Sequence, residues 1–67
     1  MRLSPKKHKI LTLLARGYTD KEIAQNLDMS TRTVQTHVSS IISTLNARNR
    51  TNAVALYMHS HPKWRII

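Results

Sequence analysis

Hydrophobic residues recur at helical spacing in four separate segments of the chain. The third segment is the clearest, because its aliphatic residues follow one another at i, i+4, i+7 and i+11. These residues are Val34, Val38, Ile41 and Leu45. We expect helices at about residues 5–16, 20–27, 31–45 and 50–60, followed by a tail at 61–67 that no feature of the pattern tethers. Apolar residues cover too much of the last helix for one buried stripe, so part of this helix is expected to face a partner.

Residues with capping chemistry precede each predicted helix. The four expected N-caps are Ser4, Thr19, Ser30 and Asn49. Thr19 and Glu22 complete a capping box, and Gly17 is the expected stop of the first helix. The first helix departs from this rule, because Lys7 stands where a capping box has Glu or Gln.

Composition and charge narrow the class of protein. The 67 residues suffice for one small domain, and eleven Lys and Arg against three Asp and Glu give a net charge of +8. The absence of cysteine excludes disulfides, thiolate zinc sites and thiol catalysis. One glycine and two prolines argue against a loop-rich β architecture. The sequence therefore predicts a single basic all-α domain over residues 1–67.

The chain carries no sign of a membrane segment or a secretory signal. Its longest apolar stretches are pairs, and the first five residues lack an apolar h-region. We therefore expect a cytoplasmic protein with no membrane partner.

The face of the third helix opposite its aliphatic stripe is polar but almost uncharged. It carries Arg32, Thr33, Thr36, Ser39, Ser40 and Ser43. Ser and Thr are mediocre helix formers, so this face costs helix stability without a gain in folding. One interpretation is a tolerated solvated face; the one we favour is a face kept slim enough to enter a groove.

The second and third predicted helices have the spacing of a helix-turn-helix unit, whose second helix lies in the major groove of DNA. Ala24 is small enough for the helices to approach closely, and Asp28 tolerates the left-handed backbone of a tight turn. Val34 follows as a core residue. Gln35 has the chemistry to grip adenine in a bidentate pair, the Thr36 methyl to meet a thymine methyl, and Arg32 to reach a guanine or a phosphate.

Several motifs resemble one family. The matching text is Leu3-Ser4-Pro5, residues 14–19 (LARGYT), 21–24 (KEIA), Thr33-Val34, Arg50-Thr51 and Ala53-Val54. The sequence resembles the DNA-binding domain of LuxR/FixJ/GerE-type bacterial transcription regulators, including the output domains of NarL-type response regulators, over roughly residues 3–60. The resemblance implies a four-helix bundle, winged-helix-like without the wing, with the third helix as recognition helix and the fourth as the surface of a homodimer.

The resemblance and the residue chemistry together predict three sets of site residues. Base contacts are expected from Gln35, Thr36, Ser39 and Arg32. Phosphate contacts are expected from Thr19, Lys21, Thr33, His37, Ser40 and Arg50. Dimer contacts are expected from Val54, Tyr57 and Met58. His37 remains equally consistent with a half-buried core histidine, and Tyr57 and Met58 with core positions.

This sequence departs from the family pattern at three positions. Lys7 replaces the usual Glu of the first helix, Thr44 replaces a usual Lys before Leu45, and Ala47 replaces a usual Val. The first change adds a positive charge, and the second removes one expected phosphate contact.

Other classes of function are weaker. A protein-interaction module is the alternative, with Lys6, Lys7 and Lys9 contacting RNA polymerase or a receiver domain. No nucleophile–base pair or glycine loop points to an enzyme, and no cofactor is implied. His59 and His61 lack the further ligands of a metal site, and Trp64 is expected to cover the end of the domain.

Overall fold

The computed structural model describes residues 3–64, which form four helices and no strand. They are α1 (Pro5–Ala15), α2 (Asp20–Asn26), α3 (Thr31–Thr44) and α4 (Arg50–Ser60). The all-α prediction is confirmed, and each of the first three helices ends one residue earlier than predicted. The reason is that Arg16, Leu27 and Leu45 act as C-caps.

All four predicted N-caps are confirmed. The Thr19 hydroxyl accepts a hydrogen bond from the Glu22 N–H at 3.2 Å, and the Glu22 carboxylate accepts one from the Thr19 N–H at 2.8 Å. The Ser4 side chain accepts a hydrogen bond from the Lys7 N–H. The second hydrogen bond of a capping box is missing, because the Lys7 side chain has no acceptor for the Ser4 N–H. The cap residues thus set where each helix begins, within one residue of the sequence prediction.

Three residues with positive φ separate the helices. Gly17 (φ 92°) ends α1 and Asp28 (φ 55°) forms the turn between α2 and α3, both as predicted. Asn46 (φ 54°) follows α3 in the same conformation, at a position that the sequence analysis did not select. Asn and Asp adopt this conformation more readily than other residues with a side chain.

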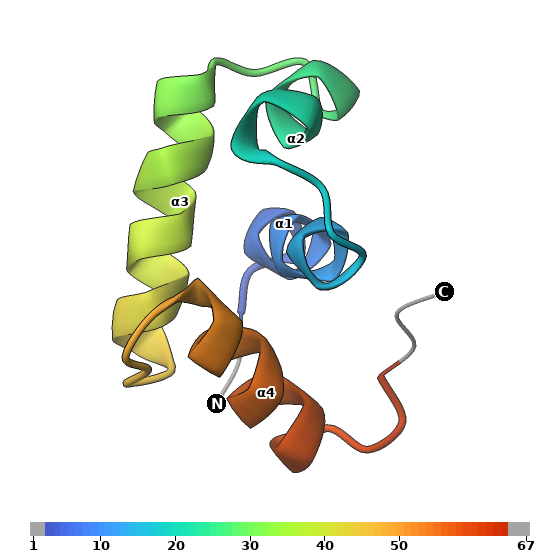
Figure 1. Ribbon diagram of the computed structural model, residues 1–67, viewed down its shortest axis with the longest axis vertical. Coiled ribbons are helices and arrows are strands. Elements are labelled where there is room, and N and C mark those ends of the chain that lie inside the picture. Colours follow the sequence, from blue (N-terminus) through green and yellow to red (C-terminus); the bar gives the residue numbers. More distant parts are fainter. Residues whose placement is uncertain (1–2, 65–67) are drawn as a thin grey trace.

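The core lies where one face of each helix meets the others. The predicted stripe of α3 is buried throughout, with Val34, Val38, Ile41 and Leu45 each at most 4% exposed. Figure 1 shows α3 along one side of the domain, α2 beside its N-terminal half, α4 near its C-terminal end and α1 seen end-on between them. This packing fixes the aliphatic side of α3 inward and leaves its polar side outward.

The segment after α4 folds back on the domain at residues 61–64, although no feature of the sequence pattern tethers the tail. The Trp64 indole Nε1 donates to Thr12 Oγ1 of α1 at 3.2 Å, and its ring packs edge-on against Tyr57 with centroids 4.8 Å apart. The expectation that Trp64 covers the end of the domain is therefore confirmed. Residues 65–67 of the tail lie outside the described residues.

Candidate nucleic-acid interface

The α2–turn–α3 unit has the geometry of a helix-turn-helix. Only residues 27–30 join the two helices, and the left-handed Asp28 reverses the chain within this short turn. The Met29 N–H donates back to the Ala24 carbonyl at 2.9 Å, which closes the end of α2. Ala24 is 5% exposed, consistent with its predicted place between the helices.

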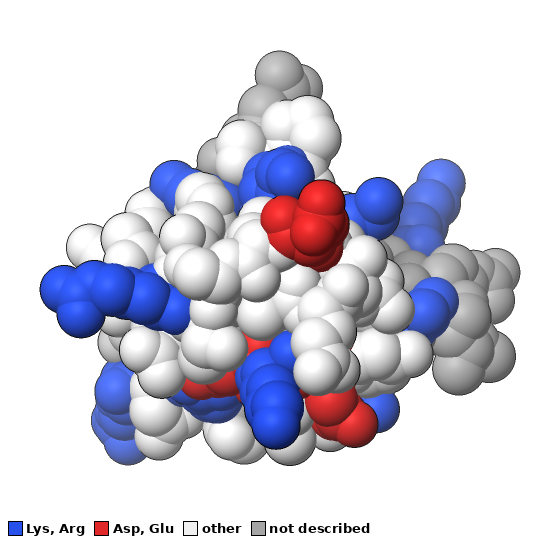
Figure 2. Space-filling view, turned by 90° about the horizontal axis from the view of Figure 1, so that it is seen from above, with Lys and Arg blue, Asp and Glu red and all other residues white. Residues whose placement is uncertain are grey.

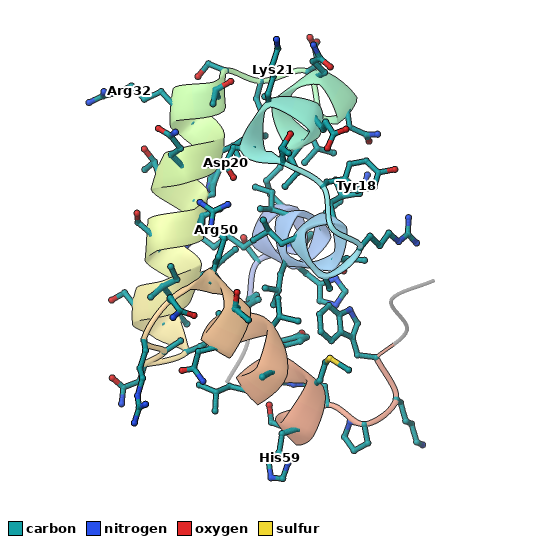
Figure 3. All side chains as sticks on the ribbon, in the orientation of Figure 1. Tyr18, Asp20, Lys21, Arg32, Arg50 and His59 are labelled. Carbon is teal, nitrogen blue, oxygen red and sulfur yellow. The ribbon has the colours of Figure 1, made fainter. Side chains whose placement is uncertain are left out.

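The outward side of α3 presents the side chains predicted to contact bases. Gln35, Thr36 and Ser39 are all exposed, as is Arg32, whose side chain projects away from the body of the domain in Figure 3. No part of the described chain covers these residues. The face is therefore accessible to a nucleic-acid duplex.

Internal hydrogen bonds restrict what two of the threonines can offer. Thr36 Oγ1 donates to the Arg32 carbonyl at 3.0 Å, so its hydroxyl proton is used within the helix. The methyl group is the part of this side chain that remains for a contact outside the domain. Thr33 Oγ1 shares a hydrogen bond with the capping hydroxyl of Ser30 at 2.8 Å. Thr36 is thus better suited to an apolar contact than to hydrogen bonding.

The residues predicted to contact phosphates lie around this face. Thr19, Lys21 and Thr33 are exposed, whereas His37 and Ser40 are half-buried beside the core stripe. Lys21 points away from the domain at the end where α2 and the N-terminus of α3 lie (Figure 3). Viewed from this end, Figure 2 shows basic side chains spread around the domain with acidic ones between them. Charge alone therefore does not single out one surface at this end of the domain.

Arg50, which is predicted to contact a phosphate, makes a bidentate ion pair with Asp20. Arg50 Nη1 lies 2.6 Å from Asp20 Oδ1 and Nη2 lies 3.1 Å from Oδ2. Figure 3 shows the two side chains approaching each other beside α3. The Asp20 side chain is 17% exposed and that of Arg50 is 45% exposed. The sequence analysis did not select Asp20, because no local spacing links residues 30 positions apart.

The ion pair favours the ionised form of Asp20. The hydrogen bond and charge of Arg50 lower the pKa of the Asp20 carboxyl below its ordinary value of 3.8, against the opposing effect of burial. The same ion pair raises the pKa of Arg50. Asp20 is therefore an ionised acceptor at neutral pH.

Comparison with known proteins identifies the family to which this geometry belongs. The family described as "Bacterial regulatory proteins, luxR family" (GerE) matches residues 1–57. The chain belongs to the LuxR family of bacterial regulatory proteins. It is a helix-turn-helix DNA-binding domain of the transcription-regulator class, as the resemblance implied.

Individual relatives agree with this assignment. The chain is 42% identical over 59 residues to the "Response regulator protein VraR" of Staphylococcus aureus (strain NCTC 8325 / PS 47), and equally to that of Staphylococcus epidermidis (strain ATCC 35984 / DSM 28319 / BCRC 17069 / CCUG 31568 / BM 3577 / RP62A). The match covers 88% of this chain and 28% of each relative, so the chain spans less than a third of their length. The solved structure "Structure of Transcription factor, GerE" superposes with a TM-score of 0.86 at 28% identity, over 97% of this chain and 96% of that one.

The last helix of this LuxR-family domain divides its predicted dimer residues between core and surface. Tyr57 is 6% exposed and packs against His8 and Trp64, so its assignment to a dimer surface is corrected to the core. Met58 is 46% exposed and Val54 is half-buried. Leu56, at 39% exposed, adds an apolar residue that the sequence analysis did not select.

The two histidines near the end of α4 have different surroundings. His61 stacks on the Tyr57 ring with centroids 4.0 Å apart, and its Nδ1 lies 3.2 Å from the Tyr57 carbonyl. His59 is exposed. Within residues 3–64 no group of three or more His, Cys, Asp or Glu side chains is placed to hold a metal ion. Over the same part of the chain, no helix has the length and apolar character needed to cross a bilayer.

Proposed function

We propose that this domain is the output domain of a response regulator, and that it binds double-stranded DNA sequence-specifically with α3 in the major groove. The observation that carries this proposal is the placement of Gln35, Thr36 and Ser39, exposed together on a helix whose opposite side is the core. A helix fixed in this way enters a groove without uncovering the core. In a cell, such a domain would be cytoplasmic and associated with the nucleoid.

Side chains on the exposed side of α3 provide the base discrimination. Gln35 carries the acceptor and donor that read adenine, and the free Thr36 methyl suits the methyl of thymine. Ser39 lies one turn further along the same face. Arg32, at the first turn of α3, is long enough to reach either a guanine or a phosphate.

The affinity comes from groups that contact the DNA backbone. Lys21 neutralises a phosphate, and the Thr19 hydroxyl keeps its proton available to one, since the Glu22 N–H uses only its oxygen. Thr33, Ser40 and His37 lie around the rim of the same face. Backbone N–H groups at the start of α3 add further donors.

The direct test is selection of bound duplexes from a randomised pool, followed by anisotropy titration of the selected site at several salt concentrations. We expect a sequence preference, and an affinity that falls as salt rises. Lys21→Ala is expected to weaken binding to all sequences and to reduce the salt slope by about one. Lys63→Ala, which removes an equal charge from the far end of the chain, is the matched control. Affinity independent of salt would contradict the phosphate contacts.

We further propose that two copies bind paired half-sites through α4. Leu56 and Met58 are the large hydrophobic residues exposed among those described, and both lie on this helix. Met58→Asp is expected to abolish cooperative binding to a two-half-site duplex while a single half-site is bound normally. His59→Asp supplies the control, because it adds the same charge at an exposed neighbouring position. Equal loss in both variants would contradict a specific α4 contact.

A second candidate function is favoured by a groove between α1 and α2. Lys6 and Lys9 line this groove together with Asn26, Leu27 and the single acidic residue Asp28, and Lys7 lies half-buried in the same first turns of α1. An acidic surface of RNA polymerase or of a receiver domain would fit this charge. Replacing all three lysines by Glu is expected to preserve the selected DNA motif and abolish transcription activation in vitro. Loss of DNA binding in this variant would contradict a separate protein-binding role.

A further inference from the structure

Four aromatic side chains meet where the chain returns from α4 towards α1. They are His8 of α1, Tyr57 of α4, and His61 and Trp64 of the segment after α4. The His8 ring lies edge-on to Tyr57 and to Trp64, with centroids 5.7 and 6.2 Å apart. Trp64 lies edge-on to Tyr57 at 4.8 Å, and His61 stacks on Tyr57 at 4.0 Å. Because rings that meet edge-on cover little of each other's faces, this arrangement leaves ring surface open.

A cavity of about 460 Å³ opens beside these rings. Its lining is almost entirely apolar and consists of His8, Tyr57, His61, Pro62, Lys63 and Trp64. Pockets that bind small molecules have volumes of about 300–1,000 Å³ and mostly apolar or aromatic walls with few polar groups. The cavity therefore has the size and the chemistry of a small-molecule pocket.

Hydrogen bonds within the chain hold two of the rings in place. The Trp64 indole Nε1 donates to Thr12 Oγ1 at 3.2 Å, and the Trp64 backbone N–H donates to the His61 carbonyl at 2.9 Å. His61 Nδ1 lies 3.0 Å from the Ser60 hydroxyl and 3.2 Å from the Tyr57 carbonyl. Trp64 therefore presents ring carbons to the cavity, since its N–H is engaged elsewhere. Walls fixed in this way spare a ligand the cost of ordering them.

The charge at the cavity selects the kind of aromatic ligand. Lys63 is the one Lys, Arg, Asp or Glu among the lining residues, and its side chain is exposed. Aromatic faces by themselves attract organic cations. Here the Lys63 ammonium repels a cation, and none of the described residues that line the cavity has a carboxylate to offset it. The net charge of +8 acts in the same direction, so an anionic ligand is favoured.

We propose that this cavity, the α1–α4 aromatic pocket, binds a small planar aromatic carboxylate, whose ring packs on Tyr57 and Trp64 and whose carboxylate pairs with Lys63. The pocket shares no lining residue with the proposed base or phosphate contacts, nor with the exposed Leu56 and Met58 of α4. In Figure 1 the segment after α4 lies on the side of the domain away from α3. The inference therefore does not rest on DNA binding, and DNA and ligand are expected to bind at the same time.

The test uses 2-naphthoate as the probe and the Trp64 indole as the reporter. Trp64 is the one tryptophan of the chain, so the 1H–15N spectrum of the labelled protein has a single indole Nε1–H signal. We expect 2-naphthoate to shift this signal to saturation with a dissociation constant of about 1 mM or below. Acetate, which carries the charge without the ring, should leave the signal in place. A signal that does not respond to 2-naphthoate, or that responds equally to acetate, would overturn the proposal.

Two further probes test the charge of the ligand. The neutral 2-naphthalenemethanol keeps the ring system and should bind about 2- to 5-fold more weakly than 2-naphthoate, as expected for the loss of one exposed ion pair. Phenyltrimethylammonium carries the opposite charge and should give no saturating shift. Binding of this cation as tightly as 2-naphthoate would identify a cation site and overturn the proposed ligand class.

Variants with matched controls locate the binding. Lys63→Ala should weaken 2-naphthoate about 2- to 5-fold and leave 2-naphthalenemethanol unchanged. Lys21→Ala removes the same charge from α2 and should change neither. His8→Ala removes one wall and should weaken both ligands, whereas His59→Ala, at an exposed position outside the pocket, should weaken neither. None of these four residues is buried, and circular dichroism checks that each variant is folded.

The variants also give results that would contradict the pocket. Equal weakening of 2-naphthoate by Lys63→Ala and Lys21→Ala would show that net charge attracts the anion, and would overturn the assignment of Lys63. Full affinity for both ligands in His8→Ala would place the binding elsewhere and overturn the proposal. Neither result bears on DNA binding, which is measured separately on the selected duplex.

Discussion

The indole Nε1 of Trp64 donates a hydrogen bond to the Thr12 hydroxyl at 3.2 Å and joins residues that lie 52 positions apart. Thr12 Oγ1 in turn donates to the His8 carbonyl at 2.9 Å, so its oxygen is oriented to accept from the indole. Trp64 also packs near the rings of Tyr57 and His8. Trp64 lies outside residues 1–57, over which the chain matches the family.

Removal of the Trp64 ring should destabilise the domain through lost packing on α1 and α4. We expect Trp64→Ala to lower the free energy of unfolding by about 1–3 kcal/mol, since the side chain is only partly buried. Trp64→Phe keeps a ring and loses the hydrogen bond, so its cost should be about 1 kcal/mol. Urea denaturation followed by circular dichroism measures both. Lys63→Ala is the control, and an equal loss in that variant would argue against a specific role for the ring.

Val38→Asp should prevent folding, because Val38 is 3% exposed and a charge at this position has no partner. The expected cost of more than about 4 kcal/mol is comparable to the whole stability of a domain this small. Ser39→Asp places the same side chain one residue later on the exposed face and should fold normally. Circular dichroism at 222 nm compares the two, and a folded Val38→Asp would reverse our assignment of the faces of α3.

Thr36 should act through its methyl group, because its hydroxyl already donates to the Arg32 carbonyl. Thr36→Val keeps the methyl and is expected to retain preference for thymine at its base. Thr36→Ser keeps the hydroxyl and should lose about 1 kcal/mol of this preference, as expected for one methyl group. Titrations of duplexes that differ at that base measure the effect. If Thr36→Val lost the preference and Thr36→Ser kept it, the hydroxyl would be the reading group.

The Asp20–Arg50 pair should make stability depend on pH in the acid range. Because the pKa of Asp20 is lowered in the folded protein, its contribution is present above the ordinary value of 3.8 and is lost as pH falls below that value. At neutral pH the contribution of such a partly exposed pair is about 0.5–1 kcal/mol.

Denaturation of the wild type and Asp20→Asn at a series of pH values measures this effect. We expect the wild type to be the more stable at neutral pH and the difference to shrink below pH 3.8. Arg50→Gln should behave like Asp20→Asn. A difference that stays constant with pH would show that the carboxylate charge contributes nothing to folding.

The sequence by itself determined the helices, their caps and the two sides of α3. The physical reason is that caps act over three residues and stripes repeat over three and four, so a local pattern contains the whole signal. The stripe from Val34 to Leu45 predicted both the buried side of α3 and, by exclusion, the exposed positions of Gln35 and Ser39.

Only the tertiary structure decided which distant side chains meet. Asp20 and Arg50 have ordinary local roles as residues of a first helical turn, and their pairing follows from how α2 and α4 pack. Tyr57 and Met58 are neighbours in an apolar segment, yet one fills the core and the other faces solvent. Trp64 finds Thr12 because the chain turns back after α4. Such contacts depend on the relative positions of whole helices, which no spacing along the chain specifies.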